Sequence, residues 1–513
     1  MEATMPRKAL TWSMLMGFAS FIIIHACAEN YEMGRHQFSG GGRFRDDMRK
    51  MQEFKASLIR HDSISAAPPS VSPSPSPSYV DPPPGRNSAR VYHVTSYGAD
   101  PTGERDSTDA LAEAIADAFR GPTEGFLIDG IANLGGAQIS LEGGYYRISR
   151  PLKLPAAGVG NLMVQGGSLR GSSTFPGDRH LIELWSPSSL KLKQKTTITS
   201  NAFFFDEVQN NNVGIYYEDI TFRDILFDSS FRGGGIFIVD SARIRITNCF
   251  FLHFTTEGIL VHKGHETFIS NTFLGQHSTV GGDKGERDFT GTAIDLDSND
   301  NAITDVVIFS AAIGIMLRGQ ANVVTGVHCY NKATGFGGIG ILVKLAGNSQ
   351  TRLDNCYLDF NAIVLEDPVQ VHVTNGFFLG DANMILKSVN GKVLGLNIVN
   401  NMFTGSSQVP IVQLEGQFGD IDQVVIDDQN NVVGMGLKST VGRLNVEGNG
   451  TKWVADFSSV LVFPNRINNF QYSFYTKGEA KFTAHAVTNV SNNVVVVESE
   501  KVVNGVVSLV VHQ

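Results

Sequence analysis

A chain of 513 residues with 42% hydrophobic residues is long enough to bury a large core, so we predict a globular protein. Its 41 basic and 50 acidic residues give a net charge of −9. This balance argues against a nucleic-acid footprint and against a polybasic membrane patch.

Residues 1–28 have the pattern of a secretory signal peptide. Arg7 and Lys8 precede an apolar run, and the run ends in the small-residue sequence at 26–28. A membrane anchor is the alternative interpretation, but no later stretch reaches the roughly 18 apolar residues that a spanning helix needs. We therefore predict a secreted, extracellular or cell-wall protein with no membrane contact after signal cleavage.

Cleavage would leave three cysteines, Cys249, Cys329 and Cys356, in an oxidising compartment. Because three is odd, at least one thiol stays free or pairs with another chain. Cys329 and Cys356 are expected at corresponding positions of neighbouring repeats, where a disulfide is possible but buried unpaired thiols are favoured. Sequons at Asn449 and Asn489 predict a glycoprotein.

Residues 29–90 form an N-terminal segment that ends in a Pro/Ser-rich linker. Order is expected to begin at Val91, and a helix should follow, with Asp106 or Ser107 placed to cap it. Its apolar residues recur at helical spacing: Leu111, Ala114, Ile115, Ala118 and Phe119. Such a helix would cover the open apolar end of a long β region.

A four-residue pattern repeats along the middle of the chain. It consists of a small residue, then Ile, then any residue, and then Val, Ile or Leu. The repeated Ile residues are Ile236, Ile259, Ile294, Ile315, Ile341 and Ile363. The steps are 21 to 26 residues, except for the 35 residues between Ile259 and Ile294. A second column places an Asn shortly before an aromatic residue, as in "TNCFF" and "TNGFF". Short strands at this period can bury their apolar faces by stacking in parallel, about 4.8 Å apart.

This period predicts an all-β chain with a right-handed parallel β-helix over residues 91–420 and an N-terminal capping helix. A propeller would need longer repeats, and a leucine-rich solenoid would need a helical half-repeat. Residues 421–513 alternate apolar and polar positions and contain an Asn504-Gly505 hairpin signal. We expect a small C-terminal antiparallel β region there.

Alternation along each repeated strand predicts a column of ionisable side chains on the outer surface. Its members are His262, Asp297, Arg318, Lys344, Glu366 and Lys387. The outward position before it is mostly apolar, with Asp295 as the exception. Apolar neighbours beside a charge column suggest the floor of a groove. The alternative is a polar solenoid surface on which opposite charges simply pair.

The long step inserts residues 275–291, which include Asp283 and Arg287, directly before the acidic strand. A long polar loop beside a groove on a rigid scaffold is a common place for binding residues. We therefore name Asp283 and Arg287 as candidate substrate contacts. A surface insertion without function is the alternative.

Asp295 and Asp297 suit glycoside hydrolysis, in which one carboxylic acid protonates the leaving oxygen and a carboxylate activates water or attacks. Residues at i and i+2 of a strand have Cα atoms roughly 6.5 to 7 Å apart. Arg318 and Lys344 would bind the carboxylates of acidic sugars. A calcium-assisted lyase could use the same set of residues and stays open as an alternative.

The residues also resemble those of a known family. "YGADPTG" with "DSTDALAEAI" looks like the start of the pectate-lyase-like β-helix superfamily, and "GERDFTGTAIDL" and "EDPVQVHVTNGFFLGDA" resemble the plant QUARTET-type polygalacturonases. The resemblance implies glycoside hydrolase family 28 and action on pectin in the wall around pollen mother cells. Of the family's usual motif residues, only Glu257 and Lys344 have counterparts. The remaining motif positions hold Gly291, Thr292, Ile313 and Leu342.

Together these observations predict a secreted polygalacturonase that hydrolyses α-1,4-galacturonan with atypical catalytic residues. The alternatives are a calcium-assisted pectate lyase and a non-catalytic pectin-binding wall protein. We expect a monomer without cofactor or metal. The catalytic candidates are Asp295, Asp297 and Glu257; the substrate-binding candidates are Lys344, Arg318, His262, Asp283 and Arg287.

Overall fold

The computed structural model describes residues 90–155, 158–185, 214–277, 290–331, 338–344, 350–479 and 482–513. All of them belong to a unit that runs from Arg86 to Gln513. The expected signal peptide and the linker before residue 90 lie outside the described residues. The same holds for two of the substrate-binding candidates, Asp283 and Arg287.

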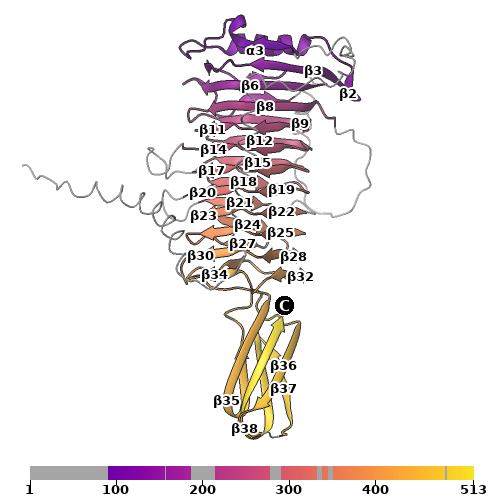
Figure 1. Ribbon diagram of the computed structural model, residues 1–513, viewed down its shortest axis with the longest axis vertical. Helices are drawn as coiled ribbons and strands as arrows, with labels where there is room; N and C mark the ends of the chain where they lie inside the picture. Colours follow the sequence, from indigo (N-terminus) through magenta and orange to yellow (C-terminus); the bar gives the residue numbers. More distant parts are fainter. Residues whose placement is uncertain are drawn as a thin grey trace, which may run out of the picture. The chain divides into compact units, whose positions relative to one another are not determined.

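The N-terminal end of the fold is covered by an amphipathic helix, as the sequence predicts. A short strand β1 (Val91–His93) and a 3₁₀ turn η2 (Val94–Tyr97) lead to helix α3 (Thr108–Arg120). The apolar face of α3 is buried in the main core, and the helix lies across the first coils (Figure 1). Without it, the apolar interior of the first coil would be open to water.

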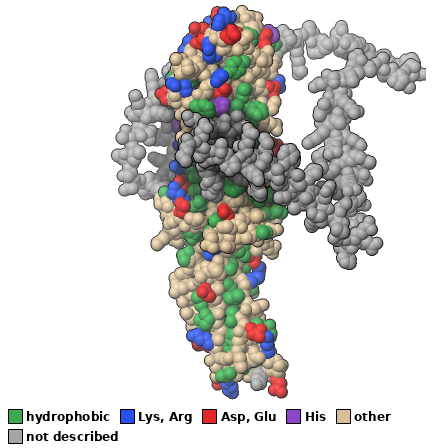
Figure 2. Space-filling view, turned by 90° about the vertical axis from the view of Figure 1, so that its left-hand side faces the viewer, with side chains coloured by type: hydrophobic (Ala, Val, Ile, Leu, Met, Phe, Trp, Pro, Cys, Tyr) green, Lys and Arg blue, Asp and Glu red, His purple; other side chains and the backbone are tan. Residues whose placement is uncertain are grey.

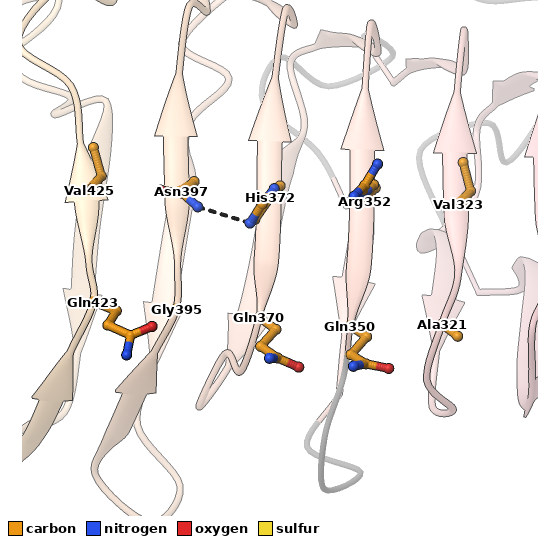
Figure 3. A pocket seen from close by; sticks show the side chains of 10 residues that line it. All are labelled: Ala321, Val323, Gln350, Arg352, Gln370, His372, Gly395, Asn397, Gln423 and Val425. Atoms are coloured by element: carbon orange, nitrogen blue, oxygen red, sulfur yellow. Dashed lines mark hydrogen bonds between the residues drawn. The ribbon is translucent and has the colours of Figure 1, made fainter.

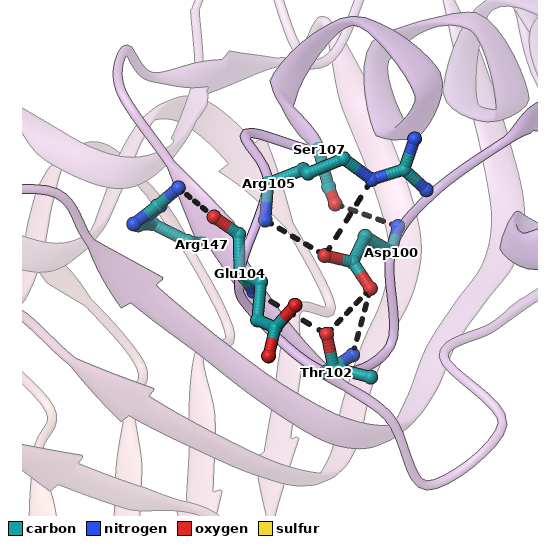
Figure 4. A network of polar contacts seen from close by, with 6 residues as sticks. All are labelled: Asp100, Thr102, Glu104, Arg105, Ser107 and Arg147. Carbon is teal, nitrogen blue, oxygen red and sulfur yellow. Dashed lines mark hydrogen bonds and ion pairs between the residues drawn. The ribbon is translucent and has the colours of Figure 1, made fainter.

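A polar network fixes the turn that leads into α3 (Figure 4). The Asp100 carboxylate accepts hydrogen bonds from the backbone N–H of Arg105 and from the backbone N–H and hydroxyl of Thr102. These bonds, led by that from Arg105, lower the pKa of Asp100 to about 2. Ser107 is the N-cap residue, but its hydroxyl accepts from the Asp100 N–H and not from the helix.

The first coils contain the longest strands of the parallel region. The longest are β3 (Ile131–Ser140), β6 (Val159–Gly171) and β8 (Tyr217–Asp228), and the shorter strands beside them are β2 (Phe126–Ile128), β4 (Tyr145–Ile148) and β5 (Leu152–Lys153). All of their pairings are parallel except that of β2 with β3. β8 pairs with both β10 and β11, so the sheets separate at this coil.

Sheet I takes one strand from each coil and pairs it in parallel with the next coil. Its strands are β7 (His180–Leu184), β9 (Gly234–Ala242), β12 (Glu257–His265), β15 (Thr292–Asn299), β18 (Ile313–Leu317), β21 (Ile339–Val343), β24 (Ala362–Glu366), β27 (Met384–Lys387) and β31 (Val412–Glu415). The repeated Ile residues of the sequence pattern pair with one another along this sheet and are fully buried.

Sheets II and III complete each coil. Sheet II contains β10 (Arg245–Thr247), β13 (Phe268–Ser270), β16 (Ala302–Thr304), β19 (Val323–Thr325), β22 (Thr351–Asp354), β25 (Val371–Thr374), β29 (Asn397–Val399) and β33 (Val425–Ile426). Sheet III contains β11 (Phe250–Leu252), β14 (Phe273–Gly275), β17 (Val307–Phe309), β20 (His328–Tyr330), β23 (Tyr357–Asp359), β26 (Phe377–Leu379), β30 (Met402–Thr404) and β34 (Asn431–Val433). The predicted right-handed parallel β-helix is confirmed.

The Asn column of the sequence marks the sharp corner between sheets II and III. Asn248, Asn355, Asn375 and Asn400 have φ between 52° and 56°. Apart from Gly, Asn is among the residues that tolerate this left-handed conformation best. One such residue turns the chain, and the next apolar side chain enters the core. Phe378 and Phe403 stack there, with ring centroids 4.5 Å apart.

The cysteines and the end of the β-helix differ in part from expectation. Cys249, Cys329 and Cys356 are buried and free, as we expected for Cys329 and Cys356. Cys329 pairs in register with Leu358, however, so the expected alignment of Cys329 with Cys356 is wrong. Parallel pairing continues to β34, beyond the residue 420 at which we expected it to end.

The C-terminal region is antiparallel, as predicted. Its strands are β35 (Val441–Asp456), β36 (Asn469–Thr476), β37 (His485–Ser491) and β38 (Val494–His512). A small parallel pair, β28 (Lys392–Leu394) and β32 (Asp420–Asp422), precedes them in the last coils of the β-helix. β38 pairs with each of the other three long strands. Their shared apolar face forms a separate small core around Trp453.

Since stacked apolar columns support the coils, we expect Ile315→Ala to lower the free energy of unfolding by about 2 to 5 kcal/mol. Ile315 is fully buried in the centre of sheet I. Chemical denaturation measures the change. Val389→Ala, at a residue with 52% exposure, is the control and should shift stability little. Equal shifts for the two variants would contradict this account of the core.

Candidate active site

The candidate residues lie on the outer face of sheet I. Leu260, Asp295 and Met316 pair in register along three successive coils, and His262 pairs with Asp297. His262 and Asp297 of the outward column are therefore neighbours, and the backbone N–H of Arg318 donates to the Leu296 carbonyl, which places Arg318 in the next coil. Since the chain returns to the same place once per coil, residues many positions apart are brought within about 4.8 Å.

Asp295 is an outward residue that is nevertheless only 2% exposed. The guanidinium of Arg318 donates a hydrogen bond to its Oδ2 at 2.5 Å. Its Oδ1 is buried and has no hydrogen-bond partner among the described residues. Burial outweighs the attraction of Arg318 and raises the pKa of Asp295 above its ordinary value.

Asp297, two residues further along β15, is in a different environment. Its side chain is 39% exposed, and His262 Nδ1 donates to its Oδ2 over 2.6 Å. This bond is the main reason that the pKa of Asp297 lies below its ordinary value. Two carboxyl groups on one face of one strand are thus pushed in opposite directions.

Glu257 is the third carboxylate and begins β12. Its Oε2 lies 3.3 Å from Nε2 of His180, a buried residue of β7. The contact with His180 is the largest cause of the lowered pKa of Glu257. His180 was not among the residues that we predicted from the sequence.

Gly234 makes the contact between Glu257 and His180 possible. Strand β9, which begins at Gly234, lies between β7 and β12 in the sheet, so the two side chains meet across an intervening coil. A Cβ at Gly234 would lie 2.4 Å from His180 Cδ2 and 2.3 Å from the Glu257 carbonyl oxygen. The sequence signal that could have indicated this close approach is the run of three glycines at 233–235.

The three carboxylates form one electrostatic group. Glu257 and Asp297 both act to raise the pKa of Asp295, while Arg318 acts to lower the pKa of all three carboxyl groups. Mutual repulsion of negative charges adds to desolvation at the most buried member. Such an arrangement can hold one carboxyl group protonated while its neighbours stay ionised.

The rest of the predicted charge column divides into a part beside Arg318 and a part in which opposite charges pair with each other. Lys344 directly follows β21, and its backbone N–H donates to the Leu317 carbonyl, which places it one coil beyond Arg318. Further on, Lys387 and Glu366 form an ion pair at 3.2 Å. That part of the column fits the alternative of simple charge pairing.

The apolar neighbours of the column form a cluster outside the main core. It consists of Met316, Leu342, Ala362 and Val364, with Ile313, Ile339 and Ile385 packed against it. The predicted apolar strip beside Asp295 is therefore present. Thr292 and Ile313 follow Glu257 in register, so the motif positions of the resembled family hold a single carboxylate here.

Two further properties of the described residues bear on the site. No group of three or more His, Cys, Asp and Glu side chains in this part of the chain is arranged to hold a metal ion. None of its helices has both the length and the apolar character needed to span a bilayer.

On the face in Figure 2, Lys and Arg are interspersed with Asp and Glu near the end that α3 covers.

Comparisons with known proteins give the family context. The family described as rhamnogalacturonase A/epimerase, pectate lyase-like, matches residues 91–357. Polygalacturonase QRT3 of Arabidopsis thaliana is 52% identical over 469 residues, which cover 90% of this chain and 91% of that protein.

Solved structures are similar at low identity. An endo-xylogalacturonan hydrolase from Aspergillus tubingensis has a TM-score of 0.44 at 12% identity, covering 68% of this chain and 95% of that one. The Streptococcus pneumoniae surface protein and adhesin PfbA has a TM-score of 0.42 at 13% identity, covering 67% and 92% of the two chains.

Gly234→Ala should displace Glu257 and His180, because the added Cβ has no room between them. If Glu257 is part of the working site, we expect the initial rate of polygalacturonate cleavage to fall roughly tenfold to a hundredfold. Gly177→Ala is the matched control, since a Cβ at Gly177 would have no other atom within 4 Å among the described residues. Equal rates for both variants, measured as reducing ends, would exclude Glu257 from the site.

Proposed function

The chain belongs to the pectate-lyase-like polygalacturonase family. We propose that it is a polygalacturonase that hydrolyses α-1,4-galacturonan, with Asp295 and Asp297 as its catalytic residues. The observation that carries the assignment is the contrast between the two carboxyl groups on one strand face: Asp295 is buried, whereas the side chain of Asp297 is partly exposed and bonded to His262. These environments displace the two pKa values in opposite directions. Glycoside hydrolysis needs one protonated carboxyl group and one ionised carboxylate beside the scissile bond. Environment alone gives these two side chains different roles.

Asp295 is the proposed general acid. Burial favours its protonated form, and Oδ1 has no hydrogen-bond partner among the described residues, so no bond to the protein competes for a proton there. Transfer of the proton lets the leaving sugar depart as an alcohol. The nearby Arg318 then stabilises the carboxylate that is left, because its guanidinium already contacts Oδ2.

Asp297 is the proposed general base. It is ionised above its lowered pKa, and its side chain is exposed enough to meet water. His262 holds the carboxylate through the Nδ1 hydrogen bond. Abstraction of a proton from water generates the nucleophile that attacks the anomeric carbon.

The remaining site residues are proposed to bind substrate. Lys344 and Arg318 supply positive charge beside the acids, which suits the carboxylates of galacturonate units. Glu257 is a third carboxylate that we place at the edge of the reacting centre, held by His180. Asp283 and Arg287 remain proposed contacts from the preceding insertion.

The cellular setting is also a proposal. The N-terminal signal pattern favours secretion to the cell wall, and the family resemblance favours pectin of the pollen mother cell wall as substrate. Asn449 and Asn489 are exposed on strands β35 and β37, where glycans could be attached. Calcium-assisted lysis and non-catalytic pectin binding remain the alternatives that an assay must separate.

The assay compares Asp295→Asn and Asp297→Asn with the parent on polygalacturonate. Each variant should form reducing ends about 10² to 10⁴ times more slowly, since each loses a proton-transfer group. Asp305→Asn is the control: Asp305 is exposed in the turn between β16 and β17, away from sheet I, and its left-handed φ of 52° suits Asn.

Three outcomes would contradict the proposal. Parent-like rates in both Asp295 and Asp297 variants would exclude the assigned pair. Unsaturated products that disappear with a chelator would indicate the lyase. Binding of polygalacturonate by the parent without new reducing ends would indicate a wall-binding protein.

The pH profile gives a separate prediction. His262→Leu removes the bond that lowers the pKa of Asp297, so that pKa rises. The base is then protonated at higher pH, and the acid limb of kcat/KM should move to higher pH. The lowered pKa of Asp297 also affects the stability of the parent protein. Ionised Asp297 stabilises the fold at pH values above its unfolded-state pKa, and this contribution is lost as the pH falls through the lower folded-state pKa.

His265→Leu is the control for the pH experiment, because His265 lies on the same strand but faces Glu266 and not Asp297. Its acid limb should coincide with that of the parent. An unmoved acid limb in His262→Leu would remove Asp297 from the role of base.

A further inference from the structure

A second candidate binding surface lies on the outer face of sheet II. It is an open groove of about 690 Å³, within the range of roughly 300 to 1,000 Å³ that is typical of ligand sites. Its lining comes from five successive coils: Ala321, Val323, Gln350, Arg352, Gln370, His372, Gly395, Asn397, Gln423 and Val425. The groove belongs to different strands from those that carry Asp295 and Asp297.

The lining residues form two rows along the helix (Figure 3). Gln350, Gln370 and Gln423 stand in one row, and Arg352, His372 and Asn397 in the other. The second row follows strand register, because Arg352 pairs with His372 and His372 with Asn397. Five coils at about 4.8 Å give a track of about 19 Å, and its polar residues come from four of these coils.

Most of the polar capacity of this track is unused. The side chains of Gln350, Gln370, Gln423 and Arg352 make no hydrogen bond or ion pair with any described residue, although Asn397 donates to His372 Nε2 at 2.9 Å. A structural amide ladder would instead join each glutamine to the next. The glutamine row is therefore available to a ligand.

We propose that this groove binds a linear, carboxylate-bearing oligosaccharide along the helix axis. Glutamine amides can both donate to and accept from sugar hydroxyls, and the Arg352 guanidinium matches a carboxylate. The aliphatic side chains of Val323 and Val425 offer apolar contact at the two ends of the second row. A phosphate polymer fits poorly, because it needs many cations and the lining has one arginine.

This inference goes beyond the proposed function, since the groove holds no proposed catalytic group. Its ligand class overlaps with the proposed substrate, however. A polymer held on sheet II would raise the local concentration of other segments of the same wall material at sheet I. The groove would thus favour long chains over short ones without changing the chemistry at Asp295.

The test uses the full chain with Asp295→Asn, so that the ligand is not consumed. Isothermal titration with a galacturonan oligomer is compared between this chain and the same chain carrying Arg352→Gln and Gln370→Ala. We expect the groove variant to lose one of two binding events, or to bind roughly tenfold more weakly if only one is resolved. Gln471→Ala, an exposed glutamine of β36, is the control and should bind as the parent does.

Unchanged stoichiometry and affinity in the groove variant would overturn the proposal. So would equal binding of a carboxyl-reduced, neutral oligomer, because Arg352 would then select nothing. Circular dichroism and the melting temperature show whether each variant is folded. Gln423→Ala, at the far end of the track, is a second variant that should also weaken binding.

A rate measurement separates this inference from the proposed function. Groove variants with Asp295 intact should cleave short oligomers at the parental rate and lose rate only on long polymer. Loss of cleavage on short oligomers would overturn the proposal that the groove is a separate site. An inactive parent would refute the hydrolase while leaving the binding result intact.

Discussion

The structure depends on parallel pairing between successive coils in the same register. Each coil returns to sheet I at nearly the same point, so Ile259, Ile294 and Ile315 stack inside while their outward neighbours stack outside. The same backbone hydrogen bonds therefore fix both the core and the spacing of the site. A one-residue slip would exchange the two faces and expose the apolar columns.

Electrostatics at the site follows from this stacking. Asp295 is surrounded by neighbouring coils and Arg318, whereas Asp297 reaches water and His262. Two chemically identical side chains thus acquire opposite pKa displacements from position alone. Close packing of backbones at Gly234 adds a contact that a residue with a Cβ would block.

The same regularity gives the protein a second surface. Sheet II repeats its outward positions at the coil spacing, and amide side chains that bond to no other described side chain collect in one row there. On sheet I, by contrast, Lys387 and Glu366 neutralise each other. A solenoid can therefore carry separate rows of polar side chains on separate faces. Side chains that do not bond to one another mark a binding track, whereas side chains that form ion pairs mark ordinary surface.

The repeat in the sequence determined the β-helix, the buried Ile columns and the outward placement of Asp295 and Asp297, because strand alternation and coil period are local properties. The helical spacing of apolar residues before the repeat determined the capping helix. It could not reveal that Asp295 is buried, that His180 reaches Glu257, or that Cys329 aligns with Leu358. Those features depend on which coils are neighbours and on the exact length of each turn. Only the tertiary structure decided them, since burial and long-range contact arise when separate coils come together.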